Sequence, residues 1–110
     1  MAIEVEGKKI ELNDDGFVID RDQWTPAVAE SIAHAQSIEL SALHWEIINL
    51  LINYCEQGNE PPSMRLLSKA IKQDLSPEKA KSIYLMKLFG SSPAKICAQI
   101  AGLPKPKNCL

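Results

Sequence analysis

The stretch from residue 41 to residue 58 reads SALHWEIINLLINYCEQG and carries a wide apolar stripe. Ser41 is a suitable N-cap and Gly58 a suitable helix stop, so the pattern predicts a helix between them. Its inward side would be formed by Leu43, Ile47, Leu50, Leu51 and Tyr54. A stripe this wide is typical of a helix that is buried on most sides. We therefore expect the rest of the chain to pack around this segment.

On its N-terminal side, residues 2–20 predict short strands. Apolar and charged residues alternate over 3–6 and 9–12, with the turn former Gly7 between the two runs. Residues 13–16, Asn-Asp-Asp-Gly, indicate a second turn, and residues 17–19 a third strand. The N-terminal region is thus predicted to be a small antiparallel meander.

After the segment 41–58, and directly before it, the chain predicts helices. Capping residues and prolines at first helical positions predict helices over 25–37, 63–74, 76–89 and 93–102. The expected fold is α+β: a small N-terminal antiparallel β-meander packed on an array of about five helices. We expect one domain over residues 1–102 and a flexible, extended, proline-rich C-terminal arm over residues 103–110.

Length and composition agree with one globular domain. The chain has 110 residues and 12.2 kDa, with 45% hydrophobic and 24% charged residues. No apolar run approaches the roughly 20 residues that a membrane span needs. The first residues, Met-Ala-Ile-Glu, do not resemble a signal peptide, so we expect a cytoplasmic protein.

The charge is distributed unevenly along the chain. Residues 1–60 hold three basic and twelve acidic side chains, whereas residues 61–110 hold nine basic and two acidic ones. A basic half favours an anionic partner, either nucleic acid or an acidic protein surface. Alternatively, the two halves complement each other within one fold.

Three cysteines, Cys55, Cys97 and Cys109, form no CxxC pair, and both histidines lie far from them in sequence. We therefore expect no metal site and no cofactor. Cys55 and Cys97 fall on apolar helix faces, which favours packing roles. His44 lies beside Trp45 without an accompanying acid and nucleophile, so we interpret it as a packing or hydrogen-bonding residue rather than a base.

The position of Cys109 is the most informative of the three. Pro104 and Pro106 force an extended backbone, and eight stretched residues reach roughly 25 Å. A thiol on such a tether could accept a sulfur atom from one partner as a persulfide and pass it to another. The alternatives are a terminal cysteine without a role and an arm that folds back so that Cys97 serves as a second thiol.

A different reading concerns residues 64–89, which have the outline of a helix-turn-helix. Together with the strands they would form a winged-helix DNA-binding module, with Lys79, Lys81 and Lys87 on the second helix. Lysines alone would contact phosphates without reading bases, and this reading leaves the cysteine arm unexplained.

The C-terminal third resembles the DsrC/TusE family. The resemblance is carried by YLMKLF at 84–89, by PAK at 93–95, by IAGLPKP at 100–106 and by the penultimate Cys109. Further matches are EGK at 6–8, DGF at 15–17, HWEII at 44–48 and PSMRLL at 62–67, so the likeness covers nearly the whole chain.

The resemblance implies a small α+β fold and a sulfurtransferase that acts as a carrier, with sulfur bound as a persulfide on Cys109. The implied partners are an upstream TusBCD-like persulfide donor and a downstream tRNA thiouridylase with its tRNA. Arg65, Lys105 and Lys107 are candidate contacts to an acidic partner or to the tRNA. A DsrC-like alternative would place the chain with sulfite reductase subunits or sulfur oxidation machinery, as a substrate-like protein.

One departure from the family pattern favours the single-thiol, TusE-like type. DsrC proteins carry a second cysteine four residues before the glycine of IAGLPKP, where this chain has Ala98, and Cys97 is rotated by about 100° on a helix. The family's Phe-Pro-x-Gly-Pro segment is also altered, since residues 89–93 read FGSSP.

Overall fold

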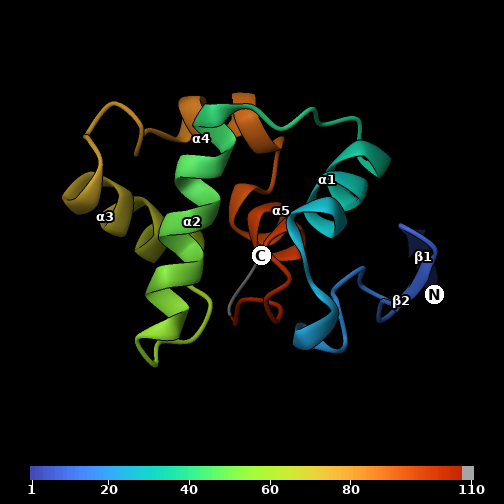
Figure 1. Cartoon of the computed structure of the whole chain (residues 1–110). Helices are drawn as coiled ribbons and strands as arrows, with labels where there is room; N and C mark the ends of the chain where they lie inside the picture. The colour runs from blue at the N-terminus through green and yellow to red at the C-terminus, as the bar shows by residue number, and fades with distance from the viewer. Residues whose placement is uncertain (108–110) are drawn as a thin grey trace.

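A computed structural model describes residues 1–107 of the chain (Figure 1). The elements within this range are β1 (Ala2–Val5), β2 (Lys8–Glu11), the 3-10 helix η1 (Arg21–Gln23), α1 (Pro26–Ala35), α2 (Ala42–Glu56), α3 (Met64–Asp74), α4 (Ser82–Phe89) and α5 (Pro93–Ile100). Helix α5 occupies the middle, with the β-hairpin and α1 on one side and α2 and α3 on the other (Figure 1). The predicted α+β class is confirmed.

The N-terminal sheet is a single antiparallel hairpin in which Ile3 pairs with Ile10. Glu6 and Gly7 both have positive φ, 51° and 79°, as a two-residue hairpin turn of type I′ requires. The predicted third strand is wrong: only an isolated bridge joins Leu12 to Val18. The strand does not extend because the chain leaves the sheet at Asp20, whose carboxylate accepts the Asp22 amide at 3.0 Å and begins η1.

Three helices begin at the predicted caps. Thr25 Oγ accepts the Val28 amide at 3.3 Å before α1, Ser41 and His44 form a capping box before α2, and Ser63 precedes α3. The fourth helix differs from the prediction. Residues 77–80 form turns and α4 begins only at Ser82, because the Ala80 carbonyl accepts the hydroxyl of Ser68 on α3 at 2.6 Å instead of continuing a helix.

The core surrounds α5, whose face with Cys97, Ala98 and Ile100 is fully buried. Its neighbours are α1, α2, α3 and α4, so nearly every helix of the domain packs against these eight residues. Leu43, which the sequence pattern placed on the inward side of its helix, is instead 43% exposed. No helix among the described residues has the length and apolarity to cross a membrane.

His44 connects two of the helices around α5. Its Nε2 lies 2.8 Å from the carbonyl oxygen of Leu88 at the end of α4, and its Nδ1 lies 2.8 Å from Ser41 Oγ. Since a carbonyl only accepts, Nε2 donates to it, and Nδ1 accepts the backbone amide of Ser41 at 3.1 Å. Phe89 packs edge-on at 5.2 Å. The prediction of a packing and hydrogen-bonding histidine is confirmed.

Candidate functional site: the start of the C-terminal arm

The arm begins with a defined helix ending. The Leu103 amide donates to the Ala98 carbonyl at 3.0 Å, and the Gly102 amide donates to the Gln99 carbonyl at 3.2 Å. This pattern, with Gly102 at φ 70° and an apolar residue after it, is a Schellman ending. Leu103 is buried, as the hydrophobic contact of that motif requires. The predicted stop at Gly102 therefore also sets the direction in which the arm leaves α5.

Trp24 fixes this ending from outside. Its indole N–H donates to the Ile100 carbonyl at 2.7 Å, and its ring lies so close to Gly102 that an added Cβ would sit 2.3 Å from Trp24 Cδ1. The Arg21 guanidinium carbon lies 4.6 Å from the centroid of the indole ring, a cation–π contact, and Arg21 Nη1 would lie 2.9 Å from the same added Cβ. Position 102 therefore needs glycine for two reasons, its backbone conformation and the space that Trp24 takes up.

The described part of the arm, residues 103–107, lies against the domain. It forms neither helix nor strand, and Leu103 and Pro106 are buried while Pro104, Lys105 and Lys107 are exposed. The sequence predicts an arm that leaves the domain at residue 103. In the structure the chain is in contact with the domain as far as residue 107, because the apolar side chains of Leu103 and Pro106 find partners on its surface.

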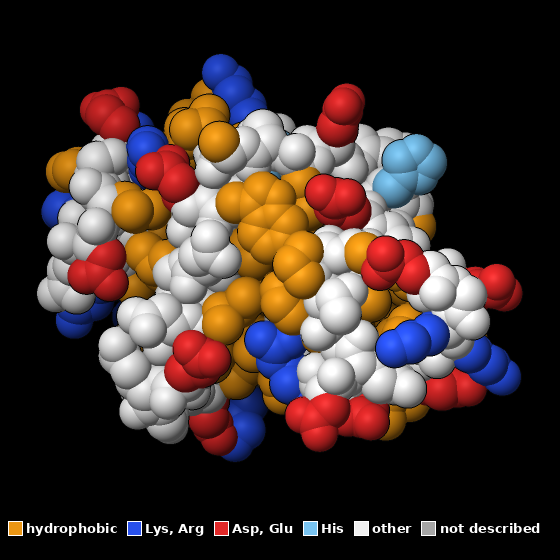
Figure 2. Space-filling view, in the orientation of Figure 1, with side chains coloured by type: hydrophobic (Ala, Val, Ile, Leu, Met, Phe, Trp, Pro, Cys, Tyr) orange, Lys and Arg blue, Asp and Glu red, His pale blue; other side chains and the backbone are white. Residues whose placement is uncertain are grey.

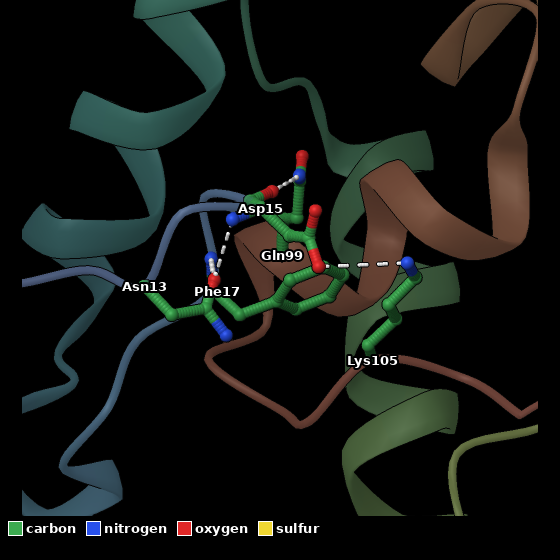
Figure 3. Close-up of polar contacts among 5 residues, drawn as sticks. All are labelled: Asn13, Asp15, Phe17, Gln99 and Lys105. Carbon is green, nitrogen blue, oxygen red and sulfur yellow. Dashed lines mark hydrogen bonds and ion pairs between the residues drawn. The ribbon is translucent and has the colours of Figure 1, made fainter. Parts of the chain in front are cut away.

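Lys105 reaches the turn of residues 13–16. Its Nζ lies 3.5 Å from the Asp15 carboxylate (Figure 3). That turn is held by Asn13 Oδ1, which accepts the amides of Asp15 at 2.9 Å and Phe17 at 3.0 Å. Gln99 Nε2 donates to the Asp15 carbonyl at 2.7 Å, so α5 and the arm hold the same turn.

Lys107 reaches the chain that follows α2. Its Nζ donates to the Glu60 carboxylate at 2.8 Å, and this contact raises the pKa of the lysine ammonium. Lys107 also lines a shallow cavity of about 370 Å³ together with Tyr54 on α2 and Leu66 on α3. Both lysines predicted to meet a partner are therefore paired with carboxylates of the chain itself.

Cys109, the residue predicted to carry sulfur, lies outside the described residues, as do Asn108 and Leu110. The reach of roughly 25 Å expected from the sequence requires that residues 103–107 leave the surface.

The other two thiols have different environments. Cys97 on α5 is 0% exposed, and burial raises the pKa of its thiol far above the ordinary range. Cys55 in the last turn of α2 is half-buried; burial raises the pKa of its thiol, and the nearby Arg21 guanidinium partly offsets this. The packing roles are confirmed for both. A disulfide between Cys97 and Cys109 would require Cys97 to leave the core.

The lysines of the predicted recognition helix do not form one face. Lys79 Nζ lies 2.7 Å from Glu46 on α2, and Lys81 Nζ lies 3.1 Å from Glu78. Both precede α4, which leaves Lys87 as the one lysine of the three within that helix. The helix-turn-helix outline is thus not a basic reading surface, since two of its cations are neutralised by neighbouring carboxylates.

Sequence reasoning missed the acidic partners of the arm. The turn at 13–16 was identified, but nothing in its own residues indicates that Asp15 faces Lys105. Glu60 follows α2 and was part of the acidic half of the chain. The only available signal was the charge asymmetry, which predicts that acidic N-terminal and basic C-terminal residues can pair within the fold, as these do.

Comparison with known proteins gives one consistent result. The family model described as "DsrC like protein" matches residues 4–110. A Sulfurtransferase TusE homolog of Haemophilus influenzae is 38% identical over 108 residues, which cover 98% of this chain and 99% of the relative. The Sulfurtransferase TusE of Escherichia coli K12 is 39% identical over 105 residues, covering 96% of each chain.

Solved structures agree with the sequence relatives. DsrC of Allochromatium vinosum superposes with a TM-score of 0.88 at 41% identity, covering 100% of both chains. The oxidized gamma-subunit of the dissimilatory sulfite reductase (DsrC) from Archaeoglobus fulgidus gives a TM-score of 0.86 at 39% identity, again over 100% of both chains. The fold and the chain length are therefore those of these proteins.

Proposed function

The chain belongs to the DsrC-like family, and from this premise we propose that it relays sulfur as a persulfide on Cys109. The observation that supports the proposal is the difference among its three thiols. Cys97 is buried and Cys55 half-buried, both with a raised pKa, whereas Cys109 follows a segment in which only Leu103 and Pro106 are buried and both lysines form exposed ion pairs. A carrier thiol must meet two partners in turn, so access decides which cysteine can serve.

The transfer conserves atoms and electrons. The Cys109 thiolate attacks the terminal sulfur of a donor persulfide, the donor's S–S bond breaks, and the donor leaves as a thiolate. The new S–S bond joins Cys109 Sγ to the transferred sulfur. In the second step the thiolate of an acceptor attacks that terminal sulfur, and Cys109 leaves as a thiolate. The carrier returns to its starting state, so it acts as a sulfurtransferase without a cofactor.

We assign the donor and acceptor from the relatives named TusE. The donor is a TusBCD-like complex, and the acceptor is a tRNA thiouridylase engaged with its tRNA. The reaction belongs in the cytoplasm, where thiols stay reduced between transfers. For the reach that both steps need, residues 103–107 must detach. Lys105 and Lys107 are held only by exposed ion pairs, whose strength is small.

Intact mass spectrometry tests the assignment. The full chain is incubated with a cysteine desulfurase and cysteine, with and without the donor complex. We expect a mass increase of one sulfur atom that maps to Cys109, persists in Cys55→Ser and Cys97→Ser, and is absent in Cys109→Ser. An adduct that maps to Cys55 or Cys97 in the folded chain would contradict the proposal.

A second candidate function is that of a DsrC-type partner of sulfite reductase, favoured by the likeness to the Archaeoglobus fulgidus gamma-subunit. A disulfide between Cys97 and Cys109 after mild oxidation would support this DsrC-type function over the single-thiol carrier. The complete burial of Cys97 and the alanine at position 98 argue against that disulfide. Non-reducing peptide mapping of the oxidised chain decides between the two.

A further inference from the structure

Helix α3 carries three cations on its outer face. Arg65, Lys69 and Lys72 follow the spacing i, i+4, i+7, which places them within about 60° of one another around the helix axis. The buried residues Leu67 and Ile71 lie on the opposite side. All three cations are exposed, and together they form a row about 10 Å long, which we call the α3 stripe.

The α3 stripe is not neutralised by the chain itself. Ion pairs within 4.0 Å among residues 1–107 involve Lys9, Lys79, Lys81, Lys105 and Lys107, and none of them involves a stripe residue. The one carboxylate on α3, that of Asp74, is at the last residue of the helix. Within residues 1–107, the α3 stripe therefore keeps its positive charge.

The α3 stripe starts where the described part of the arm ends. Leu66, next to Arg65, lines the same cavity as Lys107. Figure 1 shows α3 on the outer flank of the molecule, beside α2, and Figure 2 shows Lys and Arg side chains interspersed with Asp and Glu side chains along that margin. The described arm therefore ends beside α3, and this helix adjoins the surface that the arm occupies before it detaches.

We propose that the α3 stripe binds the phosphate backbone of tRNA while the tRNA is held by the sulfur acceptor. The inference rests on the proposed function, and it adds a substrate contact to it. Lysine is depleted in protein–protein interfaces, whereas interfaces with nucleic acid are strongly positive, so two lysines and an arginine in a row favour a polyanion over an acidic protein. Such contacts position the partner without reading sequence.

The proposal separates the basic residues that the sequence grouped together. Arg65 is part of the α3 stripe, and it is joined by Lys69 and Lys72. Lys105 and Lys107 are bound to Asp15 and Glu60 and instead hold the arm. The functional consequence is selectivity: the carrier would deliver sulfur faster to an acceptor that already holds its tRNA than to an empty one.

Binding of an unmodified tRNA transcript to the full chain, followed by fluorescence anisotropy at increasing salt, tests the contact. Three phosphate contacts predict that affinity falls about 20- to 40-fold between 50 and 200 mM salt. The triple variant Arg65→Gln, Lys69→Gln, Lys72→Gln should lower the slope of log affinity against log salt by about 2 to 3. The single variant Arg65→Lys should keep most of the binding.

The matched control is the triple variant Lys8→Gln, Lys81→Gln, Lys87→Gln, which removes the same charge from exposed positions on other elements. We expect it to bind tRNA with nearly the wild-type slope. Equal loss in both triple variants would overturn the proposal, because net charge rather than the α3 stripe would then control binding. Duplex DNA should bind with a similar slope, because phosphate contacts do not read sequence; the transfer assay below therefore tests the assignment to tRNA.

A transfer assay completes the test. Sulfur transfer from the loaded carrier to the thiouridylase is timed with and without tRNA. The stripe variant should lose the acceleration that tRNA gives and keep the tRNA-free rate; loss of the tRNA-free rate instead would mean an acidic protein partner and overturn the proposal. Loading of Cys109 with sulfur is measured in the same samples. If Cys109 does not load, the proposed carrier function is wrong; if it loads but tRNA gives no acceleration, the proposed role of the α3 stripe is wrong.

Discussion

Helix α5 and the segment 103–107 adjoin in the chain, but they are held by different kinds of interaction. The face of α5 that carries Cys97, Ala98 and Ile100 is 0% exposed, and the helix ends in a Schellman motif against which Trp24 packs. The segment after it depends on two apolar contacts, Leu103 and Pro106, and two exposed ion pairs. The comparison teaches that the arm can detach at little cost while its origin stays fixed.

The largest expected effect is at the joint between the two regions. Gly102→Ala combines a positive φ with a Cβ that would lie 2.3 Å from Trp24, so we expect a loss of about 2–4 kcal/mol in the free energy of unfolding. The matched control is Gly58→Ala, whose φ is also positive but whose Cβ would meet nothing within 4 Å; it should lose about 1 kcal/mol. Urea denaturation measures both. Equal losses would show that Trp24 does not restrict the joint.

An intermediate effect is expected in α5, where Cys97 should make the free energy of unfolding depend on pH. Burial raises the pKa of the Cys97 thiol, so the unfolded chain loses this proton at a lower pH than the folded one. The associated stability is present below about pH 9 and is lost as pH rises further, by at most about 1.4 kcal/mol per pH unit. Urea denaturation between pH 8 and 10 should show a shallower decline in Cys97→Ala than in the wild type.

Cys55 provides the control for that slope. Its thiol is only half-buried, and Arg21 offsets part of the rise in its pKa. Cys55→Ala should therefore flatten the pH dependence of the unfolding free energy less than Cys97→Ala does. The reverse order would contradict the placement of Cys97 in the core.

The smallest effect on stability is expected in the arm. Asp15→Asn with Glu60→Gln removes both carboxylates that hold Lys105 and Lys107, and the unfolding free energy should not change measurably. Trypsin cleavage after Lys107, followed by intact mass, should instead accelerate by up to about fivefold for each pair removed. The double variant Glu11→Gln, Glu78→Gln, which breaks two exposed pairs elsewhere, should leave that rate unchanged.

Several elements were predictable because their signals are local. The starts of α1, α2 and α3 follow from Thr25, Ser41 and Ser63, and the end of α5 follows from Gly102. The start of α4 was not predictable. Ser76 and Pro77 are a normal helix beginning, but contacts from Ser68 on α3 and Glu46 on α2 hold residues 79 and 80 in turns. Distant partners outweighed the local propensity.

The candidate site divides in the same way. The family likeness, the proline-rich arm and the position of Cys109 can be read from the printed residues, because they depend on order along the chain. The attachment of residues 103–107 to the domain cannot be read from the printed residues. Asp15 is 90 residues away from Lys105 and Glu60 is 47 away from Lys107, and no local pattern marks either as a partner.

The sequence by itself determined the α+β class, most helix boundaries and the family, since these depend on periodicity, caps and motif order. Only the tertiary structure decided which cations are neutralised and which remain available. Lys79, Lys105 and Lys107 find carboxylates from other segments, while Arg65, Lys69 and Lys72 find none in the part of the chain that the structure describes. The physical reason is that an ion pair depends on distance in space, which sequence separation does not specify.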